Sequence, residues 1–190
     1  MSSYSTLQLD ALKEIGNIGS GNAATSLSTL LGVPTDLEVS EIEFLSVQQC
    51  TERHHILKPE KYSVIYKVEG DLAGFLWFVI KQEDCRHISH ILANGMDVSD
   101  NHVMSEVTNI LGGTYLGALG DMAGMRISLD PPQETTIENF LENNESHQID
   151  QDNILFIKNT LTVENRPVNC YIHLVLEDPS LRALFGKFGL

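Results

Sequence analysis

The feature that most constrains this chain's fold is a helical sequence pattern that occurs twice, with the second copy 92 residues after the first. In the first copy, small and apolar residues recur at steps of three and four from about Leu7 to Leu31, which predicts a helix with one buried stripe. Gly32 and Pro34 follow the first helix and Gly124 follows the second, and such residues end helices. The predicted buried positions are Leu9, Leu12, Gly16, Gly19, Ala23, Leu27 and Leu30 in the first helix and Met104, Thr108, Leu111, Tyr115, Leu119 and Met122 in the second.

The outward faces of the two predicted helices carry an unusual set of residues. Each presents a glutamate followed three residues later by an asparagine. A helix face that only meets water usually carries mixed lysine and glutamate pairs, and each interior glycine costs a helix roughly 1 kcal/mol relative to alanine. Two interpretations follow: a surface that another molecule approaches closely, or a duplication that is only architectural. The outward positions are Asp10, Glu14, Asn17, Gly21 and Ser28 in the first helix and His102, Glu106, Asn109, Gly113 and Gly120 in the second.

The segments after each long helix also match in kind, which predicts the fold class. In each half, a strand, a two-stranded hairpin and a further helix follow, so each half is an α-β-β-β-α unit. We expect an α+β fold in which this unit is duplicated with pseudo-twofold symmetry, one largely antiparallel sheet is shared, and both long helices pack on one face. Residues 1–190 are then one domain of two repeats, about 1–97 and 98–190. The expected strands are 37–47, 62–68, 72–80, 126–129, 153–163 and 168–176, the expected shorter helices are 81–95 and 177–188, and 134–152 is expected to be a polar loop.

The composition argues against some classes of binding partner and indicates the cellular compartment. The net charge of −14 argues against binding to nucleic acid or an anionic membrane, because both are negatively charged. The longest apolar run, residues 72–80, is too short to span a bilayer. Cys50, Cys85 and Cys170 lack the spacing of a metal site and are typical of reduced thiols, so we expect a cytoplasmic protein without a secretory signal.

The spacing of the outward polar residues resembles the signature of the CheC/CheX/FliY phosphatase family. In that signature an acidic residue or serine precedes the glutamate, the asparagine follows it, and a proline stands further on. The resemblance covers essentially the whole chain, and its two-copy layout is most similar to the CheC type. Two positions depart from the pattern: Ser40 replaces the proline of the first copy, which is expected to loosen a supporting loop, and His102 replaces the leading acid or serine of the second. The matching residues are Asp10, Glu14 and Asn17 in the first copy and Glu106, Asn109 and Pro132 in the second.

The resemblance implies a chemotaxis phosphatase that hydrolyses the aspartyl phosphate of the response regulator CheY at two pseudo-equivalent sites. Asn17 and Asn109 would orient the attacking water, because an amide is both a donor and an acceptor. Glu14 and Glu106 would engage a lysine of the partner. Mg²⁺ is expected on the phosphorylated partner, with no metal or other cofactor in this chain. The remaining implied site residues are Asp10, Gly21, His102 and Gly113 at the partner interface and Pro132 in a supporting loop.

An alternative from another functional class stays open. The chain could be a non-catalytic adaptor that binds phospho-receiver domains or the receptor deamidase CheD, which the resemblance makes a further expected partner. Metal binding by histidine pairs is disfavoured, because no cysteine or acid completes a recognisable site beside them. The GSGN stretch at 19–22 lies within the helical pattern and lacks the lysine of a phosphate-binding loop. We expect surface or packing roles for His54, His55, His87 and His90, and core positions in the hairpin for Phe75, Trp77 and Phe78.

Overall fold

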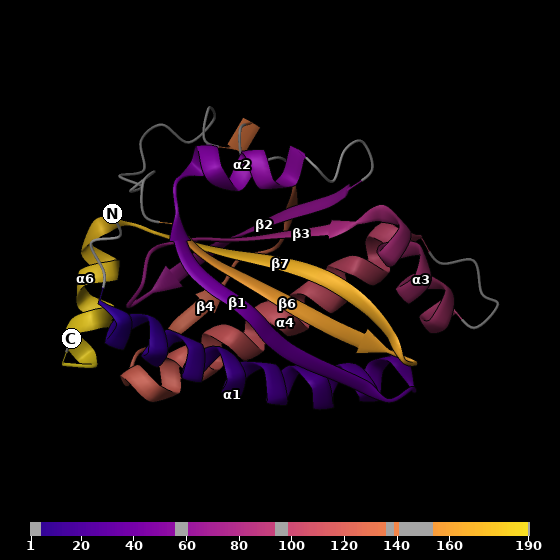
Figure 1. Cartoon of the computed structure of the whole chain (residues 1–190), viewed down its shortest axis with the longest axis horizontal. Helices are drawn as coiled ribbons and strands as arrows, with labels where there is room; N and C mark the ends of the chain where they lie inside the picture. Colours follow the sequence, from indigo (N-terminus) through magenta and orange to yellow (C-terminus); the bar gives the residue numbers. More distant parts are fainter. Residues whose placement is uncertain (1–4, 56–60, 94–98, 136–138, 141–153, 190) are drawn as a thin grey trace.

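The computed structural model describes residues 5–55, 61–93, 99–135, 139–140 and 154–189 (Figure 1). The predicted elements occur in the predicted order, and the structure adds a helix at Val47–His55 and a short strand at Gln133–Glu134, which the sequence analysis did not predict. Most of the expected polar loop at 134–152 lies outside the described residues. The first half contains α1 (Thr6–Leu31), β1 (Thr35–Leu45), α2 (Val47–His55), β2 (Lys61–Gly70), β3 (Gly74–Lys81) and α3 (Gln82–Ala93). The second half contains α4 (Asp100–Ala123), β4 (Ile127–Leu129), β5 (Gln133–Glu134), β6 (Ile154–Val163), β7 (Arg166–Leu176) and α6 (Asp178–Lys187).

The strands form one seven-stranded sheet in the order β1-β6-β7-β3-β2-β4, with β5 also paired to β2. Every pairing among these strands is antiparallel. This order has twofold symmetry, because every strand of the first half has a counterpart of the second half at the mirrored position. The counterparts are β1 and β4, β2 and β6, and β3 and β7. Each outer strand therefore pairs with the hairpin of the other half. The predicted α+β class and antiparallel sheet are confirmed, while the division into repeats near residue 97 stays a prediction.

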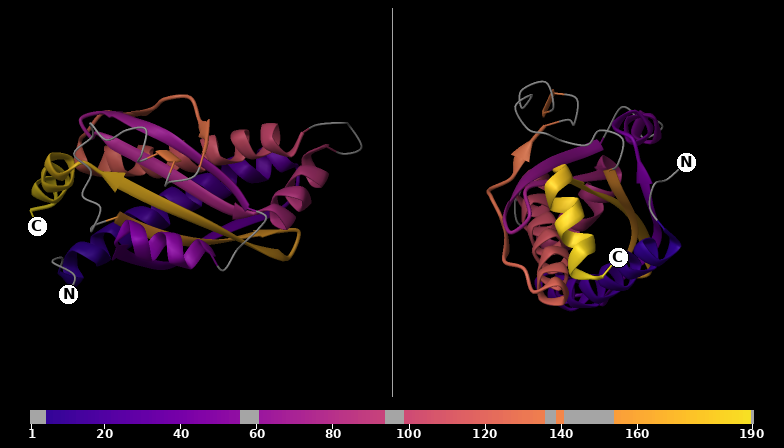
Figure 2. Two further views of the ribbon diagram at one scale, coloured as in Figure 1. Left: turned by 90° about the horizontal axis from the view of Figure 1, so that it is seen from above. Right: turned by 90° about the vertical axis from the view of Figure 1, so that its left-hand side faces the viewer.

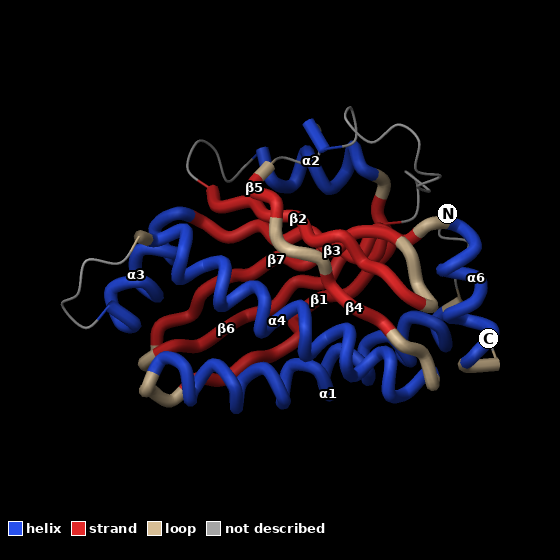
Figure 3. Tube along the Cα trace, turned by 180° about the vertical axis from the view of Figure 1, so that it is seen from behind, coloured by secondary structure: helices blue, strands red, loops and turns tan. Residues whose placement is uncertain are grey.

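The long helices α1 and α4 cover one face of the sheet and run in opposite directions (Figures 1 and 3). Both begin at a serine whose side chain accepts a hydrogen bond from a backbone N–H of the first turn, Ser5 in α1 and Ser99 in α4. Both end at a glycine in the left-handed region, Gly32 with φ of 69° and Gly124 with φ of 63°. Glycine adopts this conformation without a steric penalty, so the predicted helix ends are confirmed.

The buried stripes of the two helices largely match the prediction, with two corrections in α4. Met122, predicted to be buried, is 46% exposed. The buried stripe of α4 continues from Leu119 to Ala123, four residues further on, and Met122 is turned outward. Gly120, predicted to face outward, is buried because the chain folds back over it after Gly124. A Cβ atom at Gly120 would lie only 2.8 Å from the carbonyl oxygen of Met125.

Helix α2 lies on the opposite face of the sheet (Figure 2). A second, smaller hydrophobic core lies on that face. Trp77 lies in this core and stacks on His173, with 4.2 Å between ring centroids. Phe75 shares this core while Phe78 faces the helices, so the hairpin aromatic residues are buried as predicted. The cysteines are free and buried. Burial raises the pKa of the Cys50 and Cys85 thiols to about 12, so both are inert thiols near neutral pH.

Candidate functional site

The two Glu–Asn pairs lie on the solvent-exposed sides of α1 and α4. Glu14 and Asn17 are exposed on α1, and Glu106 and Asn109 are exposed on α4. Residues three apart on a helix project side by side, so each carboxylate stands next to its amide. Within the described parts of the chain, none of these four side chains has a hydrogen bond or ion pair. Their polar groups are therefore available to another molecule.

Glycines leave open space beside each pair. Gly21 lies four residues after Asn17, and Gly113 lies four residues after Asn109. A Cβ atom built at either glycine would meet no other atom within 4 Å. Gly19 is different, because a Cβ atom there would lie 3.1 Å from the Cα atom of Tyr115 on α4. The inward glycine thus allows α1 and α4 to approach closely, whereas the outward glycines keep the exposed faces flat.

The pairs form two separate sites rather than one composite centre. The helices meet where Gly19 contacts Tyr115, and Asn17 and Asn109 each precede their contact residue. Because α1 and α4 run in opposite directions, Asn17 and Asn109 lie on opposite sides of the contact. At 1.5 Å per residue they are roughly 12 Å apart along the helix axes.

The expected partner-binding residues lie around these pairs, together with apolar residues that the sequence analysis missed. Asp10 is exposed in α1, and His102 is exposed in the first turn of α4. Ile18, next to Asn17, is 41% exposed, and Leu7 is 63% exposed at the start of α1. Exposed large apolar residues are uncommon among the described residues, where only Met122 joins them. Their pattern was available in the sequence, since Ile18 interrupts an otherwise polar face.

Buried hydroxyl groups lie beneath each pair, and the sequence analysis did not identify them. On α1, the Ser20 hydroxyl donates to the Gly16 carbonyl oxygen at 2.8 Å and lies 2.7 Å from the Tyr115 hydroxyl. Tyr115 in turn donates to the side-chain oxygen of Asn159 on β6. Burial raises the pKa of Tyr115, so its hydroxyl stays protonated near neutral pH.

The second pair has a different buried partner. On α4, the Tyr66 hydroxyl of β2 donates to the Ser105 carbonyl oxygen at 3.1 Å and lies 2.8 Å from the Thr108 hydroxyl. Thr108 also donates to the Met104 carbonyl oxygen at 2.7 Å. Burial likewise raises the pKa of Tyr66. No short sequence motif could have revealed the tyrosine contacts, because they join residues 39 to 95 positions apart.

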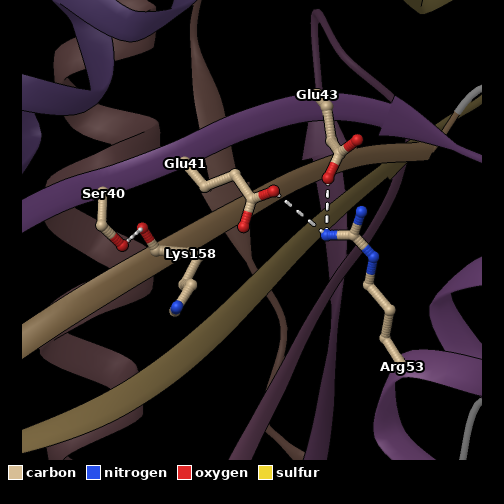
Figure 4. Close-up of polar contacts among 5 residues, drawn as sticks. All are labelled: Ser40, Glu41, Glu43, Arg53 and Lys158. Atoms are coloured by element: carbon tan, nitrogen blue, oxygen red, sulfur yellow. Dashed lines mark hydrogen bonds and ion pairs between the residues drawn. The ribbon is translucent and has the colours of Figure 1, made fainter.

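The structure corrects the expectation for Ser40. This residue lies within strand β1, not in a loop, at a bulge between Val39 and Glu41. Its hydroxyl donates to the Lys158 carbonyl oxygen of β6 at 3.1 Å (Figure 4). A bulge residue that is hydrogen-bonded across the sheet is well fixed, so the expected loosening is wrong.

Pro132 occupies the matching interruption in the second half. It follows Pro131 between β4 and β5, which both pair with β2, and both prolines are exposed. Proline has no N–H to donate, so it suits a break in the ladder. Glu134 of β5 accepts a hydrogen bond from Asn101 in the first turn of α4 at 2.8 Å. The segment after Pro132 is thereby connected to the helix that carries the second pair.

A charged cluster around Arg53 lies on the face of the sheet that is opposite α1 and α4. The Arg53 guanidinium on α2 lies 2.5 Å from Glu43 and 3.4 Å from Glu41, both on β1 (Figure 4). It also lies over the Phe156 ring, 4.8 Å from its centroid. Burial and the neighbouring Glu41 raise the pKa of Glu43, although Arg53 opposes them. The cluster fixes α2 to the sheet on the side away from the Glu–Asn pairs.

The histidines show no metal-like arrangement in the described residues. No group of three or more His, Cys, Asp or Glu side chains there could hold a metal ion. His87 is partly buried and His90 is exposed on α3, while the side chains of His54 and His55 lie outside the described ones. No helix that the structure describes is long and apolar enough to cross a membrane.

Comparisons of sequence place the chain beside named phosphatases. The CheC-like family profile matches residues 7–39, which include nearly all of α1 with Glu14 and Asn17. The chain is 30% identical over 135 residues to the CheY-P phosphatase CheC of Bacillus subtilis, covering 66% of this chain and 65% of that protein. It is 26% identical over 139 residues to the flagellar motor switch phosphatase FliY of Bacillus subtilis, covering 68% of this chain and 35% of that protein. The matched regions thus span less than two thirds of each relative.

Comparisons of structure show the same fold in several solved proteins. Thermotoga maritima FliY matches with a TM-score of 0.74 at 18% identity, covering 98% of both chains. The FliM middle domain of H. pylori matches with a TM-score of 0.71 at 10% identity, covering 97% of this chain and 99% of that one. A chain of the CheX-CheY-BeF3-Mg+2 complex of Borrelia burgdorferi matches with a TM-score of 0.50 at 16% identity, covering 84% of this chain and 96% of that one.

Proposed function

The chain belongs to the CheC/CheX/FliY family, and on that premise we propose that it hydrolyses the aspartyl phosphate of a CheY-type response regulator. The observation that carries this proposal is the repeated exposed pair, Glu14 with Asn17 and Glu106 with Asn109. Each pair is accompanied by a glycine that leaves the helix face open. Two relatives at the sequence level are named as phosphatases, and one is named for CheY-P.

The chemistry requires orientation rather than a nucleophilic side chain. An aspartyl phosphate is a reactive acyl phosphate, so its hydrolysis depends on placing water in line and stabilising charge. In the proposed mechanism, the Asn17 or Asn109 amide holds that water through its donor and acceptor groups. Glu14 or Glu106 pairs with a lysine of the partner and fixes the docking. A carboxylate paired with a lysine at the rim avoids repulsion of the phosphate.

The partner supplies the metal in this proposal. Mg²⁺ would be bound by the phosphorylated regulator. The solved complex from Borrelia burgdorferi is likewise one of CheX and CheY with BeF3 and Mg²⁺. This chain has a net charge of −14, so a phosphate pocket can approach it only where the surface is locally open. The glycine-bearing faces of α1 and α4 provide such a surface.

Phosphate release from purified phospho-CheY in the presence of Mg²⁺ tests the proposal. The Asn17→Ala/Asn109→Ala protein should lose most of the acceleration seen with the unsubstituted chain. Asn22→Ala is the matched control, because it removes an exposed asparagine of α1 that is turned about 140° from Asn17 around the helix. Equal phosphate release with the unsubstituted chain and with no protein would refute the phosphatase assignment.

The alternative is an adaptor that binds phospho-receiver domains or CheD without catalysis. The same fold occurs in the FliM middle domain, so the fold alone does not select between an enzyme and an adaptor. The phosphate-release experiment separates the two, because an adaptor binds beryllofluoride-activated CheY without accelerating phosphate loss. CheD binding remains a proposal that a direct binding measurement would test.

A further inference from the structure

We propose that two buried tyrosines, Tyr115 and Tyr66, are positioning residues for the two Glu–Asn pairs, each supplied by the half of the chain that does not carry the pair. This inference rests on the proposed phosphatase function for its activity test. Tyr115 belongs to the second half and supports α1, which carries Asn17. Tyr66 belongs to the first half and supports α4, which carries Asn109.

The contact at α1 acts on the peptide that leads into Asn17. The Gly16 carbonyl oxygen accepts from the Ser20 hydroxyl, and this carbonyl shares one rigid peptide plane with the backbone nitrogen of Asn17. The Tyr115 hydroxyl lies 2.7 Å from the Ser20 hydroxyl, and Tyr115 also donates to Asn159 on β6. Ser20 has a single hydroxyl proton, which it gives either to Gly16 or to Tyr115. When Ser20 donates to Tyr115 and Tyr115 donates to Asn159, this turn of α1 is linked to α4 and to the sheet.

The contact at α4 acts on the peptide that leads into Glu106. The Tyr66 hydroxyl donates to the Ser105 carbonyl oxygen, which shares a peptide plane with the backbone nitrogen of Glu106. The same hydroxyl lies 2.8 Å from that of Thr108, the residue before Asn109. Thr108 has a single hydroxyl proton, which it gives either to Met104 or to Tyr66, while Tyr66 donates to Ser105. One tyrosine of the sheet therefore contacts the helix turn between Ser105 and Thr108, which bears the second pair.

Because these hydroxyl contacts are buried, they restrict the movement of the helix backbone. Ser20, Tyr66, Thr108, Tyr115 and Asn159 are all buried, so water cannot easily replace a lost partner. The Glu and Asn side chains make no hydrogen bond or ion pair within the described residues, so their placement depends on the helix backbone beneath them. A catalyst that works by orienting water is sensitive to small displacements of that backbone.

The test uses backgrounds in which one site remains. Tyr115→Phe in the Asn109→Ala background should lower kcat of the first site by about tenfold with KM unchanged, and should have little effect in the Asn17→Ala background. Tyr66→Phe should show the reverse selectivity. Tyr171→Phe is the control, because Tyr171 packs against the core on the far face of the sheet. An equal loss at both sites, or no change in kcat, would overturn the inference.

Further variants guard against a general loss of structure. Ser20→Ala and Thr108→Val remove the helix hydroxyl that each tyrosine hydroxyl contacts. They should reproduce the selective losses if the phenylalanine variants fold poorly. Four variants that all leave kcat unchanged would contradict the inference.

A second readout is independent of activity. Amide hydrogen exchange should accelerate around Asn17 in Tyr115→Phe and around Asn109 in Tyr66→Phe, while unchanged exchange at both would contradict the proposed supports. If the unsubstituted chain released no phosphate, the proposed function would fail, and this exchange measurement would still decide whether the tyrosines hold the helices.

Discussion

Replacing Gly21 by leucine should stabilise the protein and at the same time lower the activity of the first Glu–Asn pair. A Cβ atom at Gly21 meets nothing within 4 Å, so the larger side chain fits without displacing any neighbour. Leucine is nearly as favourable in a helix as alanine, so the change should stabilise the folded state by about 0.8 kcal/mol. For a chain of 190 residues, this corresponds to a rise in Tm of about 2 to 3 °C.

The same leucine would stand one turn from Asn17, on the face that a receiver domain would approach. Thermal unfolding followed by circular dichroism measures the stability, and phosphate release in the Asn109→Ala background measures the first site alone. Gly21→Ala is the control for helix propensity, because it gains similar stability with much less bulk. Gly19→Ala should destabilise the protein instead, because its Cβ would lie 3.1 Å from the Tyr115 backbone. A Gly21→Leu protein that is more stable and fully active would show that the exposed face of α1 is not the docking surface.

Three other predictions concern the pairs and the ion pair beside α3. Glu14→Ala/Glu106→Ala should weaken binding of activated CheY, measured by calorimetry, whereas Asn17→Ala/Asn109→Ala should mainly lower the maximal rate; a large fall in Tm in either would show a structural role. Asn17→Ala and Asn109→Ala alone should each leave about half of the total activity, because both pairs rest on ordered backbone; a loss confined to one of them would contradict equal sites. Burial raises the pKa of Asp84 against the opposing effect of Arg166, 3.2 Å away. Folding therefore favours the protonated form of Asp84. The free-energy cost of ionising this carboxyl group in the folded protein is absent below its unfolded pKa, and it grows as the pH rises through its folded pKa. Arg166→Ala should then lower the free energy of unfolding by about 1 to 2 kcal/mol at pH 7, a value that already allows for the partial exposure of Arg166. In acid the loss should be smaller, and urea unfolding at both pH values measures the difference.

Local sequence patterns were sufficient for most of the secondary structure. The long helices were predictable because their buried stripes repeat at helical spacing and because Gly32 and Gly124 end them. The hairpins were predictable because apolar runs flank short polar turns, and in the second hairpin Glu164 and Asn165 adopt positive φ in that turn. Helix α2 was missed although its signal was present: Ser46 and Gln49 form reciprocal capping contacts at 3.2 and 2.8 Å.

Features that depend on distant contacts could not be predicted from local patterns. The fixed position of Ser40 requires the carbonyl oxygen of Lys158, which lies 118 residues away in the chain. The burial of Gly120 depends on where the chain turns back after the helix. The buried tyrosine contacts depend on which strands and helices become neighbours. The exposed Glu–Asn pairs were predictable as outward residues, while their catalytic role rests on the proposed chemistry.

The interleaved sheet predicts that neither half of the chain folds alone. In residues 1–97, β1 would lack its partner β6, and β2 would lack β4 and β5. The long helix α1 would also lose α4, against which Gly19 and Ser20 pack. In residues 98–190, Tyr115 would lose Ser20, and β7 would lose β3. Separately expressed fragments 1–97 and 98–190 should therefore show no cooperative thermal transition, and mixing them should restore one. A cooperative transition in either fragment alone would mean that the repeat is an independent folding unit and that the shared sheet assembles afterwards.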